Sequence, residues 1–274
     1  MRLRAGGLRF AVEPDEALVP VEVEAILRLD PDEGTDAGEP FRVELSPAPP
    51  WTSDDPALFP REDPAVFRWK DGRLLGSHAS FVAEIDPFAG RARLHRREAR
   101  AFPLEAVLRA SLMARLPLAG GLPFHAAGVT VHGKGVVLFG PSGAGKTTVA
   151  STSPHPVLSD ELVAVAPGRP FRLVRSGFWG EGRASGRVGP APLALLVDLA
   201  RGSRLSLERL RPAEATGRFL ASVPVPLAPP LWSRVLSVAA ELVRAVPVYR
   251  MEWTPAEPPW EGLEALLAGL SRRT

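Results

Sequence analysis

The chain has 274 residues, no cysteine and a formal net charge of +2 at pH 7. The missing cysteines exclude disulfides, thiolate zinc sites and cysteine nucleophiles, and so small a charge argues against a nucleic-acid partner. No apolar run approaches the roughly 18–20 residues that a membrane span needs, and the first ten residues lack the apolar core of a signal peptide. We therefore expect a cytoplasmic protein without a membrane partner.

The first hundred residues are typical of a β-rich region. Apolar and β-branched residues alternate in part over residues 8–12 and 19–29, which predicts strands. Residues 30–60 are rich in Asp, Glu, Gly and Pro and predict loops around one short strand. A clearer antiparallel series follows, with expected strands over residues 66–70, 73–86 and 91–96.

A helix is expected next. Pro103 can open it, because proline is tolerated in a first helical turn, and the pair Gly120-Gly121 can end it. Apolar residues at helical spacing form one stripe along this segment. The members of the stripe are Leu104, Val107, Leu108, Leu112 and Leu116. We expect this stripe to belong to the core.

From residue 121 onward, short apolar strands alternate with helices. Residues 128–131 and 136–139 predict two strands joined by a hairpin turn at residues 132–135. Later strands are expected over residues 162–166, 171–174, 193–199 and 248–253, and later helices over residues 212–220, 230–246 and 260–270. We expect an α/β protein with two parts. Residues 1–101 form a smaller β-rich region that is a candidate for substrate recognition, and residues 102–274 form a catalytic domain.

A glycine-rich loop follows directly on the strand expected over residues 136–139. It matches the pattern Gly-x-x-x-x-Gly-Lys-[Ser/Thr]. Its residues are Gly140, Pro141, Ser142, Gly143, Ala144, Gly145, Lys146, Thr147 and Thr148. Glycines let successive backbone amides point at phosphate oxygens, and a helix after the loop adds its N-terminal dipole. We expect Lys146 to reach the β- and γ-phosphates of a nucleoside triphosphate and Thr147 to ligate Mg²⁺.

The alternative is a glycine-rich turn with a chance lysine. The strand, the loop, the lysine and the hydroxyl all agree with the phosphate-binding interpretation, so we favour that one.

Two adjacent acids, Asp160 and Glu161, follow the loop after a short expected helix. Phosphoryl transfer needs an acid that organises magnesium, and a kinase also needs a base for the acceptor hydroxyl. In ordinary sites of this type the aspartate ends a long apolar strand, whereas here the apolar run over residues 162–166 comes after the acids. The pair is therefore either the metal- and proton-binding group or a turn acid that begins the strand.

Two further residues are candidates. His125 lies just before the hairpin, and Glu181 lies in a glycine-rich stretch near Arg175 and Arg183. A lone histidine is often structural. A glycine loop with an acid and arginines could hold substrate, metal or phosphate, or could be a plain connection. Both alternatives stay open on the residues alone.

Taken together, several segments resemble the catalytic domain of the HPr kinase/phosphorylase superfamily. The segments that carry the resemblance are residues 124–129, the hairpin, residues 140–148 and residues 158–163. The sequence is more similar to the shorter HPr-kinase-like proteins found beside peptide-modification genes, including tailoring kinases of lasso peptide pathways. Residues 178–181 and 246–250 look like segments of that subgroup. The resemblance covers roughly residues 122–253 and leaves the first hundred residues unmatched.

The resemblance implies a P-loop kinase fold related to phosphoenolpyruvate carboxykinase, with an antiparallel hairpin leading into the loop. It implies that Asp160 is the general base, that Glu161 supports the metal or the acceptor, and that His125 is the motif histidine. It implies, through a looser alignment, that Glu181 binds metal.

Two features depart from the family. Pro154 and Pro156 shorten the helix after the loop to about two turns. The segment with the pattern Glu-x-Arg-Gly is missing, so we do not predict reverse phosphorolysis.

The leading hypothesis is therefore a kinase that uses ATP and Mg²⁺ to phosphorylate a hydroxyl, expected to be a serine of a peptide or small protein. Arg175 or Arg183 would steady the transferring charge, and a homo-oligomer is possible. A P-loop nucleoside triphosphatase acting as a switch or motor is the first alternative, although the motifs Asn-Lys-x-Asp and Leu-Ser-Gly-Gly-Gln are both missing. A non-catalytic nucleotide-binding module is the second.

Overall fold

The structure, a computed structural model, describes residues 1–13, 18, 20, 30–31, 39–46, 65–97, 100–178, 180, 189–225 and 229–272. Over these residues the chain is a mixed α/β protein with two sheets, and it divides into two compact units. The first unit is Met1–Ala119 with Val225–Trp232, and the second unit is Gly120–Pro224 with Ser233–Thr274.

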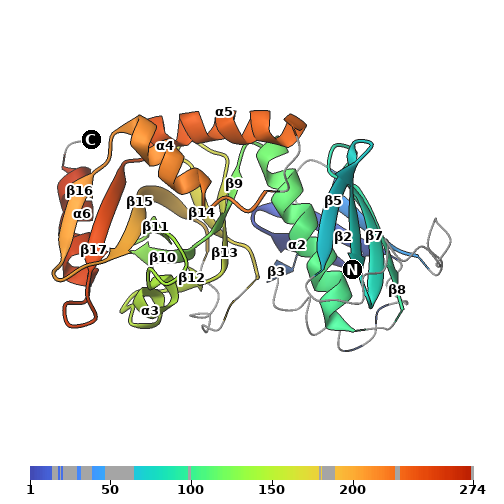
Figure 1. Ribbon diagram of the computed structural model, residues 1–274, viewed down its shortest axis with the longest axis horizontal. Helices are drawn as coiled ribbons and strands as arrows, with labels where there is room; N and C mark the ends of the chain where they lie inside the picture. Colours follow the sequence, from blue (N-terminus) through green and yellow to red (C-terminus); the bar gives the residue numbers. More distant parts are fainter. Residues whose placement is uncertain are drawn as a thin grey trace. The chain divides into compact units, whose positions relative to one another are not determined.

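The first unit is built on a mixed eight-stranded sheet (Figure 1). Its strands are β1 (Arg2–Ala5), β2 (Leu8–Glu13), β3 (Asp30–Pro31), β4 (Phe41–Leu45), β5 (Val66–Lys70), β6 (Arg73–His78), β7 (Phe81–Asp86) and β8 (Arg91–Arg96). They lie in the order β3-β1-β2-β4-β8-β7-β6-β5. Strand β4 is parallel to both of its neighbours, β2 and β8, and the other neighbouring strands are antiparallel.

Helix α2 (Ala101–Leu118) packs on β7 and β8 of this sheet. The predicted apolar stripe is buried, including Leu104, Val107 and Leu112. The predicted division between residues 101 and 102 therefore differs from the compact units, because burial of this stripe joins α2 to the strands before it. A role in substrate recognition for this region stays a prediction.

The stretch predicted as one strand over residues 73–86 is two strands, β6 and β7. The chain turns at Ala79 and Ser80, where the backbone amide of Ser80 donates a 3.0 Å hydrogen bond to Nδ1 of His78. Because this turn contains neither glycine nor proline, the sequence pattern did not reveal it. The strand predicted over residues 19–29 lies almost entirely outside the described residues.

The second unit is built on a nine-stranded sheet around the long strand β15 (Ala191–Arg201) (Figure 1). The other strands are β9 (Leu122–His125), β10 (Ala127–Val131), β11 (Lys134–Phe139), β12 (Val157–Ser159), β13 (Leu162–Ala166), β14 (Arg172–Arg175), β16 (Ser206–Arg209) and β17 (Val248–Trp253). Strand β15 is parallel to β11 and to β17, and its first residues also pair with β14. The sheet continues from β11 through β10 to β12, and from β14 through β13 to β9.

Two parts of this sheet approach each other closely, and glycine permits the approach. A Cβ atom added to Gly128 on β10 would lie 2.5 Å from Cγ1 of Val163 on β13. A Cβ atom added to Gly135 on β11 would lie 2.7 Å from Cβ of Leu173 on β14. Larger residues at either position would push the strands apart.

The hairpin between β10 and β11 has a two-residue turn. His132 and Gly133 have φ angles of 48° and 77°, as a type I′ turn requires at both central positions. The predicted turn over residues 132–135 was two residues too long, because β11 already begins at Lys134.

Helices cover the sheet of the second unit. Helix α3 (Lys146–Ser151) and helix α6 (Trp260–Ser271) contribute to its core. The core includes Val129, Val136, Leu138, Val149, Leu195, Val197, Met251, Trp253, Trp260, Leu263 and Leu267. Helix α4 (Pro212–Leu220) places Phe219 next to Phe124 and Phe139, with ring centroids 5.7 and 6.5 Å apart.

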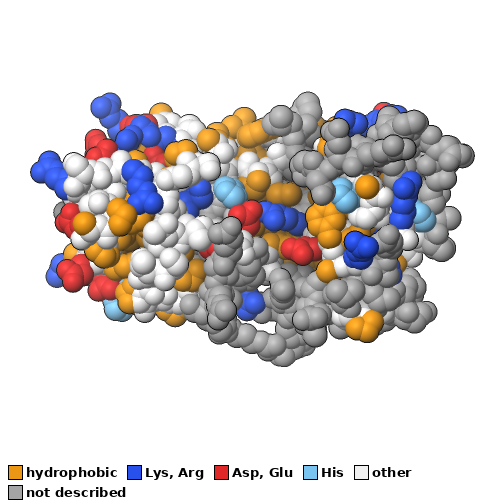
Figure 2. Space-filling model, turned by 60° about the horizontal axis from the view of Figure 1, so that its bottom comes forward, with side chains coloured by type: hydrophobic (Ala, Val, Ile, Leu, Met, Phe, Trp, Pro, Cys, Tyr) orange, Lys and Arg blue, Asp and Glu red, His pale blue; other side chains and the backbone are white. Residues whose placement is uncertain are grey.

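Helix α5 (Pro229–Ala245) is the remaining helix of the described chain. Among the helices that the structure describes, none is both long enough and apolar enough to cross a bilayer. On the face that Figure 2 shows, Lys and Arg side chains stand among Asp and Glu side chains.

Candidate functional site

The glycine-rich loop, residues 140–145, connects the end of β11 to the start of α3. Gly140, Gly143 and Gly145 have φ angles of 144°, 79° and 93°, in the region that side-chain-bearing residues rarely adopt. The backbone conformation of the loop therefore requires glycine at these positions of the sequence pattern. Helix α3 begins directly at Lys146, so its first amides face the loop.

Two neighbouring parallel strands hold the loop in place. A Cβ atom on Gly140 would lie 2.7 Å from the carbonyl oxygen of Leu199 on β15, and one on Gly145 would lie 2.3 Å from Cζ2 of Trp253 on β17. The indole nitrogen of Trp253 donates a 2.9 Å hydrogen bond to the carbonyl oxygen of Ala144. The guanidinium of Arg201 lies 4.2 Å from the centre of the Trp253 ring, within the range of a cation–π contact.

Lys146 is folded back under the loop. Its Nζ donates hydrogen bonds of 3.0 and 3.2 Å to the carbonyl oxygens of Gly140 and Pro141, and the residue is only 8% exposed. Burial lowers the pKa of Lys146 below its ordinary value, and the carboxylate of Glu161 partly opposes that shift. The ammonium group of Lys146 therefore lies within electrostatic reach of the predicted acidic pair.

The two predicted acids reach the edge of the sheet where the loop begins. Strands β11 and β12 both pair antiparallel with β10, and Gly128 of β10 is in register with Val137 on one side and Ser159 on the other. Strands β11 and β12 therefore end at the same edge of the sheet. Asp160 and Glu161, which follow β12, lie at this edge beside the start of the loop, which follows β11.

Asp160 is almost fully buried, with 4% of its surface exposed. The backbone amide of Gly180 donates a 3.0 Å hydrogen bond to Oδ1 of Asp160, and the hydroxyl of Ser159 donates a 2.8 Å hydrogen bond to the carbonyl oxygen of Phe178. A Cβ atom on Gly180 would lie 3.2 Å from Oδ2 of Asp160. The backbone around Phe178 and Gly180 thus lies directly against the acidic pair and fixes the Asp160 carboxylate.

His125 joins this group from β9. It pairs with Leu162 at the start of β13, and its Nδ1 lies 3.6 Å from Oε1 of Glu161. The histidine side chain is about half exposed and the glutamate is less exposed, at 49% and 28%. The fold therefore brings His125, Glu161 and Lys146 together from three separate segments.

Thr147 and Thr148 lie exposed in the first turn of α3. Arg175 ends β14 and pairs with Val163 of β13, the strand that lies between β14 and the strand of His125. Glu181 and Arg183 lie outside the described residues, so their predicted roles stay predictions.

Asp198 is a further acid of this site that was not predicted from the sequence. This residue is in register with Phe139, the last residue of β11, and is 6% exposed. Its Oδ2 accepts a 3.1 Å hydrogen bond from Arg218 of α4. Burial raises the pKa of Asp198 above its ordinary value, and the Arg218 guanidinium only partly offsets that effect. The signal in the sequence was an aspartate directly after an apolar run, because Asp198 follows Leu195, Leu196 and Val197.

A cavity of about 630 Å³ opens at the opposite end of the parallel strands, among residues such as Lys134, Leu193 and Tyr249 near the starts of β11, β15 and β17. Ligands of sheets with parallel strands bind beyond the carboxyl ends of those strands. The loop, the acids and His125 lie at that carboxyl end, so we place the candidate site there and not in this cavity.

No protein-family model matches the chain, and no curated protein matches it. Among solved structures the chain is similar to the HPr(Ser) kinase/phosphatase from Coxiella burnetii, with 15% sequence identity and a TM-score of 0.23. The match covers 44% of this chain and 88% of the other. Similarity at this level carries no argument about fold or activity, so the interpretation of the site depends on the residues described above.

Proposed function

We propose that this protein is a magnesium-dependent kinase that transfers the γ-phosphate of ATP to a hydroxyl group, a serine of a peptide or small protein. The observation that carries the proposal is the convergence of the buried Asp160, the neighbouring Glu161 and the loop lysine Lys146 at one edge of the sheet. A phosphate-binding loop alone would serve many functions. A fixed carboxylate at the same edge is what a kinase needs to accept a proton.

The loop supports the binding half of this proposal. Residues 140–145 have the left-handed glycines that let successive amides turn inward, and the helix that starts at Lys146 adds its N-terminal amides. The Nζ of Lys146, which now bonds to Gly140 and Pro141, would exchange these carbonyl oxygens for phosphate oxygens.

The donor set at this edge fits Mg²⁺, which prefers hard oxygen ligands. Thr147 would offer its hydroxyl and Asp160 a carboxylate oxygen, and the sequence resemblance alone suggests Glu181 as a further ligand. A bound magnesium ion would supply neutralisation of the charge on the β- and γ-phosphates.

In this proposal the transfer is a direct displacement at the γ-phosphorus. The acceptor hydroxyl oxygen forms a bond to the γ-phosphorus while the bond from that phosphorus to the β–γ bridging oxygen breaks, and ADP leaves. The proton of the hydroxyl passes to the carboxylate of Asp160, which the Gly180 amide holds in one orientation. His125, 3.6 Å from Glu161, would orient the glutamate carboxylate beside the acceptor.

A transfer assay with γ-labelled ATP and Mg²⁺ tests this proposal. The acceptors are a library of serine-containing peptides and a matched library in which alanine replaces each serine. We expect label in the serine library alone. In Asp160→Asn, kcat should fall about 10²–10⁴-fold, as for loss of a general base, while ATP binding persists.

Glu261→Gln is the control, because Glu261 is an exposed carboxylate in the first turn of α6 and lies outside the residues that form the candidate site. This variant should keep most of the transfer activity. Hydrolysis of ATP without transfer to any acceptor would instead indicate a triphosphatase that acts as a switch. ATP binding without either reaction would indicate a non-catalytic module, and undiminished transfer by Asp160→Asn would refute the assigned base.

A further inference from the structure

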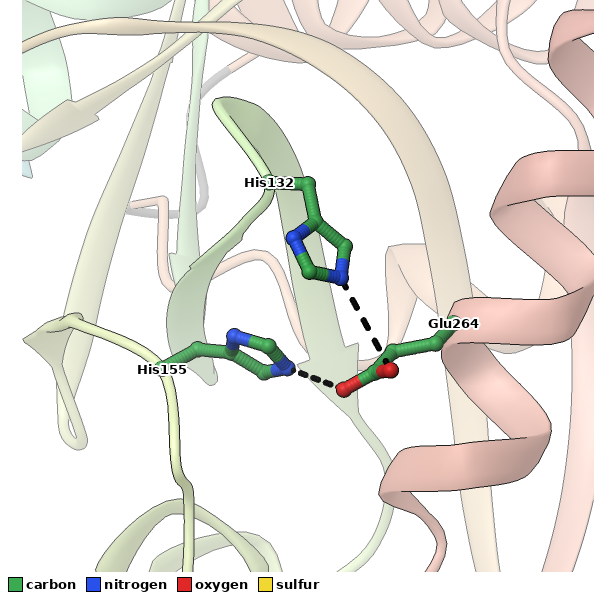
Figure 3. Close-up of side chains that lie close together, drawn as sticks. All are labelled: His132, His155 and Glu264. Carbon is green, nitrogen blue, oxygen red and sulfur yellow. Dashed lines mark hydrogen bonds and ion pairs between the residues drawn. The ribbon is translucent and has the colours of Figure 1, made fainter.

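Two histidines and a glutamate converge at the end of β11 that is far from the glycine-rich loop (Figure 3). His132 lies in the β10–β11 turn, His155 follows α3, and Glu264 lies on α6. The chain contains only five histidines, and the fold brings two of them beside one carboxylate from a distant segment. Each residue offers one atom that could ligate a metal ion, and these atoms all lie within 4.8 Å of one another.

The side chains are aimed at a common point. The Nε2 atom of His155 lies 2.7 Å from Oε1 of Glu264, and the Nε2 atom of His132 lies 3.7 Å from Oε2 of the same carboxylate. Figure 3 shows both rings directing a nitrogen at the carboxylate. Four ligands at the usual zinc bond lengths of about 2.0–2.1 Å stand roughly 3.3 Å apart, so small side-chain rotations would bring these atoms to ligand distances.

An ion pair and a metal ion would use these three side chains differently. To hydrogen-bond the carboxylate from Nε2, both imidazoles of His132 and His155 must carry a proton on that nitrogen. One carboxylate would then serve two rings whose centres lie only 5.2 Å apart. A divalent cation instead uses the Nε2 lone pairs of two neutral imidazoles together with the carboxylate oxygen.

We propose that His132, His155 and Glu264 bind a divalent transition metal ion of the zinc type. Two imidazoles and one carboxylate are a ligand set that Zn²⁺ accepts in a tetrahedral site with one open position for water. Imidazole ligands favour zinc, copper and nickel over magnesium and calcium. The site is therefore chemically distinct from the magnesium site proposed at the glycine-rich loop.

The surroundings fix one ligand and leave another accessible. The side chain of His155 is only 12% exposed, and its ring meets Trp260 edge-on at 5.8 Å. The backbone amide of His155 donates a 3.0 Å hydrogen bond to the hydroxyl of Ser153. The side chain of His132 is 69% exposed, so an ion can enter from solvent on the side of the hairpin.

Metal binding would join three segments of the second unit. The turn before β11, the segment after α3 and helix α6 would share one ion. Because β11 and α3 are the two elements that flank the glycine-rich loop, the ion would hold the base of the candidate site. It should stabilise the folded chain more as its concentration rises above the dissociation constant, as any ligand of the native state does.

Isothermal titration calorimetry with ZnCl₂ tests the site on the full chain after treatment with a chelator. The titration is run with saturating Mg²⁺, so that oxygen-donor sites are already occupied. We expect one zinc ion per chain and a melting temperature that rises with zinc concentration. Replacement of zinc by Co²⁺ should give the intense visible absorption of a tetrahedral cobalt site.

Single substitutions separate this site from zinc bound elsewhere. Glu264→Gln and His132→Asn should each weaken zinc binding at least about tenfold, the loss that even outer-shell changes produce. Asparagine suits the left-handed backbone at position 132, so this variant keeps the turn. Glu261→Gln, on the same helix, is the control and should bind zinc like the wild type.

Far-UV circular dichroism confirms that each variant is folded before titration. A wild-type chain that binds no zinc overturns the proposal. Zinc binding that Glu264→Gln and His132→Asn leave unchanged overturns it equally.

Discussion

The indole nitrogen of Trp253 donates a hydrogen bond to the carbonyl oxygen of Ala144 across 109 residues of sequence. This bond ties the last residue of β17 to the middle of the glycine-rich loop. The bond holds a loop with three left-handed glycines against β17.

Trp253→Phe should destabilise the protein and weaken ATP binding. The substitution keeps an aromatic ring but removes the donor for the Ala144 carbonyl oxygen, and we expect a loss of about 1–2 kcal/mol in the free energy of unfolding. Urea denaturation measures this change. Trp260→Phe is the control, because the indole nitrogen of Trp260 is buried without a hydrogen-bond partner among the described residues. Trp260→Phe should lower the free energy of unfolding by less than Trp253→Phe does. Equal losses of stability in both variants would contradict the role of the Trp253 hydrogen bond.

Alanine substitutions at two loop glycines should differ in their effect. Both Gly143 and Gly145 have positive φ angles, 79° and 93°, so each substitution costs about 1–2 kcal/mol of backbone strain. A Cβ atom on Gly143 meets nothing within 4 Å, whereas one on Gly145 lies 2.3 Å from Trp253. Gly145→Ala should therefore lose a further 1–3 kcal/mol or so to overpacking. Denaturation curves that show equal losses would indicate that Trp253 does not press on the loop.

Lys146→Met should abolish tight ATP binding while the protein stays folded. The substitution removes charge-assisted hydrogen bonds to phosphate, worth about 1.5–3 kcal/mol, or roughly a 10- to 150-fold loss of affinity. Lys146→Arg should not restore binding, because a planar guanidinium does not replace a compact ammonium in this buried position. Calorimetric titration with ATP and Mg²⁺ measures both variants, and wild-type affinity in Lys146→Met would place the triphosphate elsewhere.

The burial of Asp198 predicts a pH dependence of stability. Burial raises the pKa of Asp198 above 3.8 in the folded state, so the folded protein binds this proton more tightly than the unfolded chain. The contribution of Asp198 to wild-type stability therefore falls as the pH rises from 3.8 through the raised pKa. Asp198→Asn lacks this titration. Its free energy of unfolding, relative to the wild type, should increase with pH across that window. Urea denaturation at several pH values measures the difference, and a difference that decreases with pH would be the opposite of this expectation.

Much of the second unit could be predicted from sequence because its signals are local. The predicted helix over residues 212–220 coincides with α4, and the predicted strand over residues 248–253 coincides with β17. Each segment has a clear hydrophobic period and a proline at its start or just before it. The glycine-rich loop was equally visible, because its strand, glycines and helix are contiguous. The short strands β9 and β12 were missed, since three or four residues carry no readable period.

Contacts between distant segments could not be predicted in the same way. Nothing in the sequence near Ala144 indicates that Trp253 will bond to it, and nothing near His132 indicates His155 or Glu264. The bond from Gly180 to Asp160 likewise depends on how β13 and β14 return the chain to the acids. These relationships exist only once the sheet has formed, so a single sequence does not reveal them.

A crystal structure of the chain with Mg²⁺ and a non-hydrolysable ATP analogue tests the central claim most directly. We predict β- and γ-phosphates held by the backbone amides of residues 142–147, with Nζ of Lys146 moved from the Gly140 carbonyl oxygen to a phosphate oxygen. The Asp160 carboxylate should face the γ-phosphate. A loop without phosphate, or an Asp160 carboxylate that points away from the γ-phosphorus, would contradict the account.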